Sequence, residues 1–512
     1  MTLSKPGTSS RTKKALFQDI PIPASEISHL KTICKLSHQQ AEQTAKFVRT
    51  WKGRNSIESG ALDKVRENDK ALIEYFTTKK CLMDSSNKSE RMNEKKVERT
   101  LVYCHNISGL IDHICQYREL SLGDRYYIKI GIDGGRSFLK VCLNLEKYDN
   151  FTSQNNQNKK WSYTAGPCSK KFKDSGVNKL MILGIVEEVF ENYDNLKMIL
   201  SHIDFEVLKK KKIDYSYAFD MKLANIFLGL GPVSSKYPCP WCEISKDEFS
   251  HFNRTSMEIN LRDINSIREN SSKYQVAVSE HQGKRKLSSA PFFSCEKMPL
   301  VHQTTDNTAL TLDLVPPMEL HLMLGVVNDL YDHLDKQLKE NHCSITANDW
   351  SDTLGLKRLH YHGGQFNGNQ CKTLLSNTRT LEEILHKAGA YSIGKPVLQV
   401  LEQFNRVKKS CFGGKLNADY HVQIETFSDL YLALGKSVTP KVHAIFLHIP
   451  QFLEQNKNLQ KGLGYWSEQA SETVHSDFDS LWIGSSYKRA ITHKSYNSQL
   501  LKCVIAYNSR HL

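Results

Sequence analysis

The segment RYYIKIGIDGGRSFLKVCLNLEK, residues 125–147, constrains the fold of this chain more than any other part of its sequence. Two runs rich in β-branched and aromatic residues flank a Gly-Gly pair, a pattern that predicts a β-hairpin. KLMILGIVEEV (179–189) and DYSYAF (214–219) are also strand-like, and a helix is expected between them over residues 195–203. Three strands, a helix and a fourth strand in this order predict an α/β core.

The rest of the chain is predicted to be mainly helical. Residues 26–120 show helical periodicity with polar breaks, and beyond Gly231 the helical pattern continues for about two hundred residues. Met318–Leu338 is the clearest amphipathic helix, and another is expected over residues 465–482. Residues 1–25 are rich in Ser, Thr and Lys without periodicity, which predicts a disordered basic tail.

The charge balance favours a polyanionic partner. The chain has 512 residues, with 69 Lys and Arg against 55 Asp and Glu, a formal net charge of +14. Nucleic acid is the first candidate for such a partner, although many basic proteins bind nothing acidic. Because no apolar run is long enough to span a bilayer and the first residues lack an apolar core, we expect neither a membrane span nor a secretory signal. Its 13 cysteines lack the rhythm of a disulfide framework, which indicates a reducing compartment.

Two aspartates follow predicted strands of the α/β core. Asp133 ends the run YIKIGID, and Asp220 comes directly after DYSYAF. A single Asp at the end of a strand is usually a turn former. Two such residues on neighbouring strands, with a glutamate on a later helix, have the composition of a site that holds two divalent cations for phosphodiester cleavage. The pair is therefore the candidate for catalysis.

The motif CPWC, with Cys239 and Cys242, is either a redox pair or half of a zinc site. A thioredoxin-like motif begins a helix directly after a strand, whereas CPWC follows a helix and a polar turn, so zinc is favoured. His443 and His448 in KVHAIFLHIP have a spacing usual for the second half of such a site. Two separate histidines of this kind are more often unrelated, but together with CPWC they favour one shared structural zinc site.

In their order along the chain, these segments resemble the Transib transposases and their descendant, the catalytic core of the antigen-receptor recombinase. The resemblance extends from about residue 125 to the C-terminus. The motifs that carry it are IDGGRSF, DMKLANIFLGLGPVSSKYPCPWC, MELHLMLGVVNDLY, QFNGNQCKTLL, KVHAIFLHIP and GYWSEQASETVHSDF. It implies that Asp133 and Asp220 are the first two catalytic aspartates, and that the zinc ligands are Cys239, Cys242, His443 and His448.

The resemblance places the third catalytic carboxylate in GYWSEQASETVHSDF, where two glutamates compete. Alignment on Trp466 selects Glu472, whereas counting from His448 selects Glu468, because this chain has a longer loop before Trp466. Since a surface loop accommodates insertions at little cost, the Trp466 alignment is preferred. Glu472 is the expected catalytic residue, and Glu468 is the alternative.

The implied architecture is α/β + α: an RNase H-like catalytic core of a mixed sheet with helices, interrupted by a large, mostly helical zinc-containing insertion, with a helical N-terminal region. The expected divisions are a disordered tail over 1–25, a DNA-end-binding and dimerisation region over 26–120, core segments over 121–235 and 451–512, and the insertion over 236–450. The resemblance implies two catalytic Mg²⁺ or Mn²⁺ ions, one structural Zn²⁺, double-stranded DNA with terminal inverted repeats as substrate, a homodimer, and action in the nucleus.

The implied activity is that of a cut-and-paste transposase, which nicks transposon ends, forms hairpins and transfers strands. The main alternative is a domesticated or inactive descendant that binds DNA without cutting it. An unrelated RNase H-like nuclease would cut without end specificity or strand transfer. A zinc-dependent interaction module would not need Asp133 or Asp220, and a thiol oxidoreductase would need an accessible CPWC.

Overall fold

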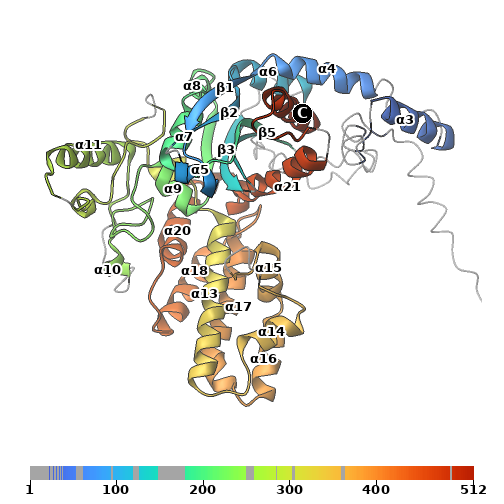
Figure 1. The fold of residues 1–512 in the computed structure, drawn as a ribbon. Coiled ribbons are helices and arrows are strands. Elements are labelled where there is room, and N and C mark those ends of the chain that lie inside the picture. The colour runs from blue at the N-terminus through green and yellow to red at the C-terminus, as the bar shows by residue number, and fades with distance from the viewer. Residues whose placement is uncertain are drawn as a thin grey trace, which may run out of the picture. The chain divides into compact units, whose positions relative to one another are not determined.

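The described residues of the chain form an α/β structure with a six-stranded sheet and many helices (Figure 1). The computed structural model describes residues 38–52, 61–93, 96–118, 126–135, 137–147, 179–249, 259–283, 285–302, 306–358, 364–484 and 487–512, with isolated positions before residue 38. Apart from residue 22, the predicted tail over 1–25 lies outside the described residues. The chain forms two compact units, Met1–Tyr215 with Ala470–Leu512, and Ser216–Gln469.

The sheet has the strand order β1-β2-β5-β4-β3-β6. The strands are β1 (Phe76–Met83), β2 (Val97–Cys104), β3 (Tyr126–Gly135), β4 (Phe138–Lys147), β5 (Leu180–Glu187) and β6 (Asp214–Ala218), the last of which leads from the first unit into the second. The pairs β1–β2, β2–β5, β5–β4 and β4–β3 are antiparallel. The four strands expected from the sequence are therefore confirmed.

The predicted hairpin is formed by β3 and β4. Gly135 pairs with Phe138 at the turn, and the register continues from Asp133 opposite Lys140 to Tyr126 opposite Lys147. Residues 127–132 of β3 are buried, because this strand lies inside the sheet between β4 and β6. The buried run ends at the half-buried Asp133, so the last polar residues of β3 lie where the strand leaves the core.

The expectation that residues 26–120 are helical is wrong for β1 and β2. Helices α3 (His38–Lys52), α4 (Ala61–Ile73), α5 (Lys88–Asn93) and α6 (Ile107–Tyr117) do occur there. However, β2 pairs with both β1 and β5, and its Leu101 and Val102 are both buried. Charged residues within VERTLVYC and FTTKKCLM interrupt the alternation of polar and apolar residues that is typical of a strand. These two strands are stabilised by their pairing within the sheet.

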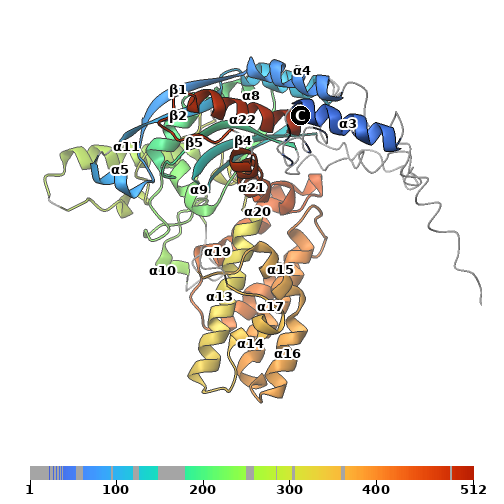
Figure 2. The same cartoon turned by 45° about the vertical axis from the view of Figure 1, so that its right-hand side comes forward.

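Helices cover the sheet within the first unit. The C-terminal helix α22 (Tyr496–His511) packs along β1, β2 and β5 (Figure 2). Its Asn508 side chain donates to the Ile182 carbonyl and accepts from the Ile182 amide, next to a shift of register between β4 and β5. Helix α7 (Tyr193–Leu200) confirms the helix expected over 195–203, and α8 (Glu206–Lys210) follows it.

The second unit is mainly helical, as expected beyond Gly231. Figures 1 and 2 show α13, α15 and α17 packed side by side, and α17 also packs against α16 and α18. The elements are α9 (Met221–Phe227), α10 (Lys246–Phe249), α11 (Ile264–Glu280), η4 (Ala290–Phe292), α12 (Thr311–Leu314), α13 (Glu319–Glu340), α14 (Ala347–Thr353), α15 (Gly368–Ser376), α16 (Thr378–Lys387), α17 (Tyr391–Cys411), α18 (Tyr420–Ala433), α19 (Pro440–His443), η6 (Ala444–His448), α20 (Ile449–Gln455), η7 (Lys457–Leu459) and η8 (Leu463–Tyr465). Among the described residues, no helix combines the length and apolarity that crossing a bilayer requires.

Candidate metal centre and the acidic residues

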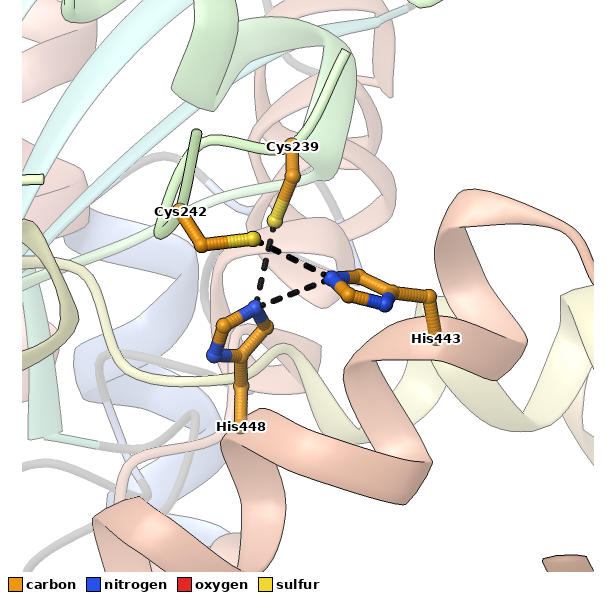
Figure 3. Close-up of side chains that lie close together, drawn as sticks. All are labelled: Cys239, Cys242, His443 and His448. Atoms are coloured by element: carbon orange, nitrogen blue, oxygen red, sulfur yellow. Dashed lines mark hydrogen bonds between the residues drawn. The ribbon is translucent and has the colours of Figure 1, made fainter. Parts of the chain in front are cut away.

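Four predicted zinc ligands converge in the second unit (Figure 3). Cys239 Sγ lies 3.3 Å from His448 Nε2, and Cys242 Sγ lies 3.2 Å from His443 Nε2. The two Nε2 atoms are 3.3 Å apart. All four side chains are buried, and their donor atoms lie within 4.8 Å of one another. The two halves of the motif, 201 and 209 residues apart in these pairs, are brought together as expected.

The spacing of these donor atoms fits a tetrahedral zinc ion. With Zn–N distances of about 2.0–2.1 Å and Zn–S of about 2.3 Å, tetrahedral coordination separates ligand atoms by roughly 3.3–3.8 Å. The two Nε2 atoms, 3.3 Å apart, match the lower end of this range, whereas the two sulfur–nitrogen separations of 3.2 and 3.3 Å are slightly shorter than the roughly 3.5 Å of such a pair on one zinc ion. Four protein donors leave no position for a substrate, which is typical of a structural rather than a catalytic zinc site.

A buried arginine holds the cysteine half of the centre in place. Arg262 donates through Nε to the carbonyl oxygens of Cys239 and Cys242, both at 3.0 Å, and through Nη2 to the Phe293 carbonyl at 2.9 Å. Its side chain has no exposed surface. The Trp241 indole inside the motif donates to the Val315 carbonyl at 2.7 Å. The CPWC backbone is therefore fixed by the protein at both cysteines.

A π-helical turn aligns the two histidines. His443 ends α19, and His448 ends the π-helical segment η6, five residues later. In an α-helix, residues five apart point about 140° away from each other. The wider π turn, with its i→i+5 hydrogen bonds, brings residue i+5 back over residue i. Both imidazoles therefore reach the same point.

Contacts around the centre orient the imidazole rings. Gln451 Oε1 lies 3.1 Å from His448 Nδ1, so the amide oxygen can accept a hydrogen bond from a protonated Nδ1 and leave Nε2 for a metal. Phe249 stacks on His443 with ring centroids 4.4 Å apart. Burial lowers the pKa of His443 and favours its neutral, metal-binding form.

The two thiols differ in acidity. Burial raises the pKa of Cys239. Hydrogen bonds with Cys242 and the two histidines, together with the charge of His448, lower this pKa by more, so the net shift is downward. Burial, followed by the interaction with Cys239, raises the pKa of Cys242. One thiolate thus opposes the formation of the second, and a divalent cation is the group that stabilises both together.

Asp133 lies in the first unit at the end of β3, and its side chain is 30% exposed. Its Oδ2 is 2.7 Å from Nε2 of His475, on α21 (Gln469–Gly484). The other ring nitrogen, Nδ1, is 2.5 Å from Nζ of the buried Lys140. Neither His475 nor Lys140 was expected from the sequence. The sequence feature that could have indicated His475 is its spacing of three residues from the predicted catalytic Glu472 within one expected helix.

Asp220 lies in the second unit and is the N-cap of α9. Its Oδ1 accepts a hydrogen bond from the Leu223 backbone amide, with the nitrogen 2.6 Å away. Burial lowers the pKa of the nearby Lys441, while the carboxylates of Asp220 and Glu468 act in the opposite direction. The Lys441 side chain also lies against α13 at Gly325, where an added Cβ would clash with its Cδ. The second unit therefore brings Asp220, Glu468 and a lysine together.

The two candidate glutamates belong to different units of the chain. Glu468 is buried, and its Oε1 accepts from the backbone amide of His321 at 3.0 Å, in the first turn of α13. Its Oε2 is buried and has no hydrogen-bond partner among the described residues. Glu472 lies within α21, in the first unit. The choice between them, and the convergence of three carboxylates from two units, stay predictions.

Comparison of the chain with protein-family models and with curated proteins gives no match. The metal centre and the acidic residues are therefore interpreted from their own chemistry.

Proposed function

We propose that this chain is a metal-dependent DNA-cutting and strand-transferring enzyme of the cut-and-paste transposase type, with an RNase H-like core and a zinc-containing helical insertion. The observation that carries the proposal is the assembly of Cys239, Cys242, His443 and His448. The family resemblance implies this ligand set from motifs two hundred residues apart in the chain, about the separation of 201 residues between Cys242 and His443. The excess of basic residues supports a polyanionic substrate.

The acidic residues have the chemistry to hold hard cations. Asp133, Asp220 and Glu472, with Glu468 as the alternative to Glu472, would hold two Mg²⁺ or Mn²⁺ ions through carboxylate oxygens, which such ions prefer. When bound, these ions supply activation of the attacking oxygen and stabilisation of the leaving one. The partial exposure of Asp133 and the unpartnered Oε2 of Glu468 fit this role.

The protein contributes position and charge. The hydrogen bond from His475 orients Asp133, and the N-cap geometry fixes Asp220 at the start of α9. A structural zinc ion would clip the cysteine turn to the α19–η6 helical segment within the second unit. The proposed substrate is double-stranded DNA with terminal inverted repeats, and the proposed site of action is the nucleus. The proposed active form is a homodimer, because both ends of an element must be cut together.

The test is a cleavage assay with Mn²⁺ or Mg²⁺ on DNA that carries the repeats flanking the element that encodes the chain. Asp220→Asn is the sharper variant than Asp220→Ala, because an amide oxygen can still cap α9 while the charge is lost. Asp263→Asn is the matched control, since Asp263 caps α11 with the same 2.6 Å geometry.

We expect metal-dependent nicks and hairpins from the wild type and from Asp263→Asn, and a fall of at least about 100-fold with Asp220→Asn. Binding of the repeats without cutting, unchanged by Asp220→Asn, would instead identify a descendant that only holds DNA. Cutting without end specificity or strand transfer would identify a different nuclease.

A further inference from the structure

A lysine is buried in the sheet of the first unit, beside the proposed catalytic aspartate. Lys140 is only 1% exposed and pairs in register with Asp133 across the β3–β4 hairpin. Its ammonium lies 5.3 Å from the ring centre of Phe138 and 5.5 Å from that of Phe478. Buried charges require specific partners, and aromatic faces supply only part of that stabilisation. The position of this lysine therefore depends on the polar group that its Nζ meets.

A polar group that Nζ contacts is the imidazole of His475, which lies between the lysine and the aspartate. Lys140 Nζ is 2.5 Å from Nδ1, and Asp133 Oδ2 is 2.7 Å from Nε2. An ammonium group has only protons to donate, so Nδ1 accepts. The ring proton then resides on Nε2, which donates to Asp133. This pattern assigns His475 the tautomer with its proton on Nε2, and both hydrogen bonds then run from Lys140 toward Asp133.

Gly135 allows the ring to occupy this position. A Cβ at residue 135 would lie 3.0 Å from both Cδ2 and Nε2 of His475, closer than ordinary van der Waals contact. The second glycine of IDGGRSF thus provides the space into which α21 places its histidine. The hairpin and α21 are more than 330 residues apart in the chain, and their surfaces are complementary at this point.

We propose that Lys140 and His475 form a positioning relay that fixes the carboxylate of Asp133 for a divalent cation. The inference rests on the proposed function. His475 binds Oδ2, so Oδ1 is the oxygen that meets the cation. Because Nε2 carries the proton, His475 acts as a donor to the carboxylate and is not itself a metal ligand. Lys140 fixes that tautomer from within the core.

The alternative is an ion pair that only ties α21 to the sheet. Both roles predict lower stability when the contacts are removed, so the deciding measurement is the affinity of the folded protein for Mn²⁺. Outer contacts of metal ligands typically change affinity 10- to 100-fold. Electron paramagnetic resonance of free Mn²⁺, titrated with the full chain without DNA, measures this affinity independently of cleavage.

Four variants separate the possibilities. His475→Leu and Lys140→Met remove one contact each, and His475→Gln keeps a donor toward Asp133 and an acceptor toward Lys140. Lys129→Met replaces a buried lysine of the neighbouring strand β3 and serves as the control for lost stability. Circular dichroism at the titration temperature establishes that each variant is folded. The ¹⁵N signals that His475→Gln removes report the tautomer of His475 in the wild type.

We expect Mn²⁺ affinity to fall about tenfold or more in His475→Leu and Lys140→Met, and to stay within about threefold of the wild type in His475→Gln and Lys129→Met. The ¹⁵N signals should show a protonated Nε2. Wild-type Mn²⁺ affinity in folded His475→Leu overturns the relay and leaves the proposed function standing. A wild-type chain that binds no Mn²⁺ and cuts no DNA overturns both.

Discussion

The metal centre and the surroundings of Asp133 are both built from segments far apart in the chain, but they differ in how their polar groups are satisfied. In the centre, four buried donor atoms face one point, and the His443 and His448 Nε2 atoms lie 3.3 Å apart. Around Asp133, a lysine, a histidine and a carboxylate satisfy one another, and Asp133 stays 30% exposed. The difference teaches that the first site is buried and could hold a cation among its four donor atoms, whereas the second is ordered by protein contacts and leaves its aspartate partly exposed.

The largest expected effect is on the buried metal centre. In Cys239→Ser, one thiolate ligand is lost and the bound zinc should fall from one ion per chain to near zero, as measured by inductively coupled plasma mass spectrometry. Structural zinc contributes on the order of 10 kcal/mol to the folding of small domains, so the second unit should unfold at a much lower temperature. Cys343→Ser, outside the centre, is the control. If Cys239→Ser contains no zinc but unfolds at the same temperature as the wild type, the proposed distinction between the two sites is wrong.

The next effect concerns the protein groups that hold the cysteine turn. Arg262→Met removes the donor to the Cys239, Cys242 and Phe293 carbonyls, and these buried acceptors lose their partner. We expect a loss of about 3 kcal/mol in the free energy of unfolding by urea, with faster zinc release to a chelator. Arg285→Met, at an exposed position, should change neither quantity. If both variants behave alike, the carbonyl contacts do not organise the site.

Acid should release the metal from the buried metal centre. Burial lowers the pKa of His443 below the value of roughly 6.5 expected in the unfolded chain. The unfolded state therefore takes up the proton first, and the stabilisation from neutral His443 is complete above about pH 6.5 and is lost as the pH falls. Each proton taken up changes stability by about 1.4 kcal/mol per pH unit.

Zinc retention between pH 8 and pH 4.5, followed with a colorimetric chelator, checks this expectation. The exposed His421 lies outside the centre, so His421→Gln should keep the wild-type profile. A profile that is flat across this pH range would contradict protonation of the ligands as the cause of release.

The smallest expected effect is on the surroundings of Asp133. Gly135→Ala adds a methyl group 3.0 Å from the His475 ring, which must shift. We expect about 1 kcal/mol of lost stability and a weaker Mn²⁺ affinity, measured by thermal unfolding and by the titration described above. Gly414→Ala, where no heavy atom lies within 4 Å of the added carbon, is the control. An unchanged Gly135→Ala would mean that the ring has room to move without consequence.

Local patterns predicted much of the fold. The hairpin over residues 125–147, the strand at 179–189 and the long helix at 318–338 were all indicated by periodicity and turn residues, and they are present as β3–β4, β5 and α13. The strands β1 and β2 were missed, because their charged residues interrupt the alternation and their stability comes from pairing in the sheet.

The sequence by itself determined which residues are chemically able to bind metals: two cysteines in CPWC, two histidines in KVHAIFLHIP, and the aspartates that follow β-strands. The tertiary structure alone decided how they are used. The π turn of η6 carries His448 back over His443, and the packing of α21 on the hairpin places His475 between Lys140 and Asp133. Residue types are local properties, whereas these contacts depend on helix geometry and on packing between segments that are distant in the chain, which local patterns do not record.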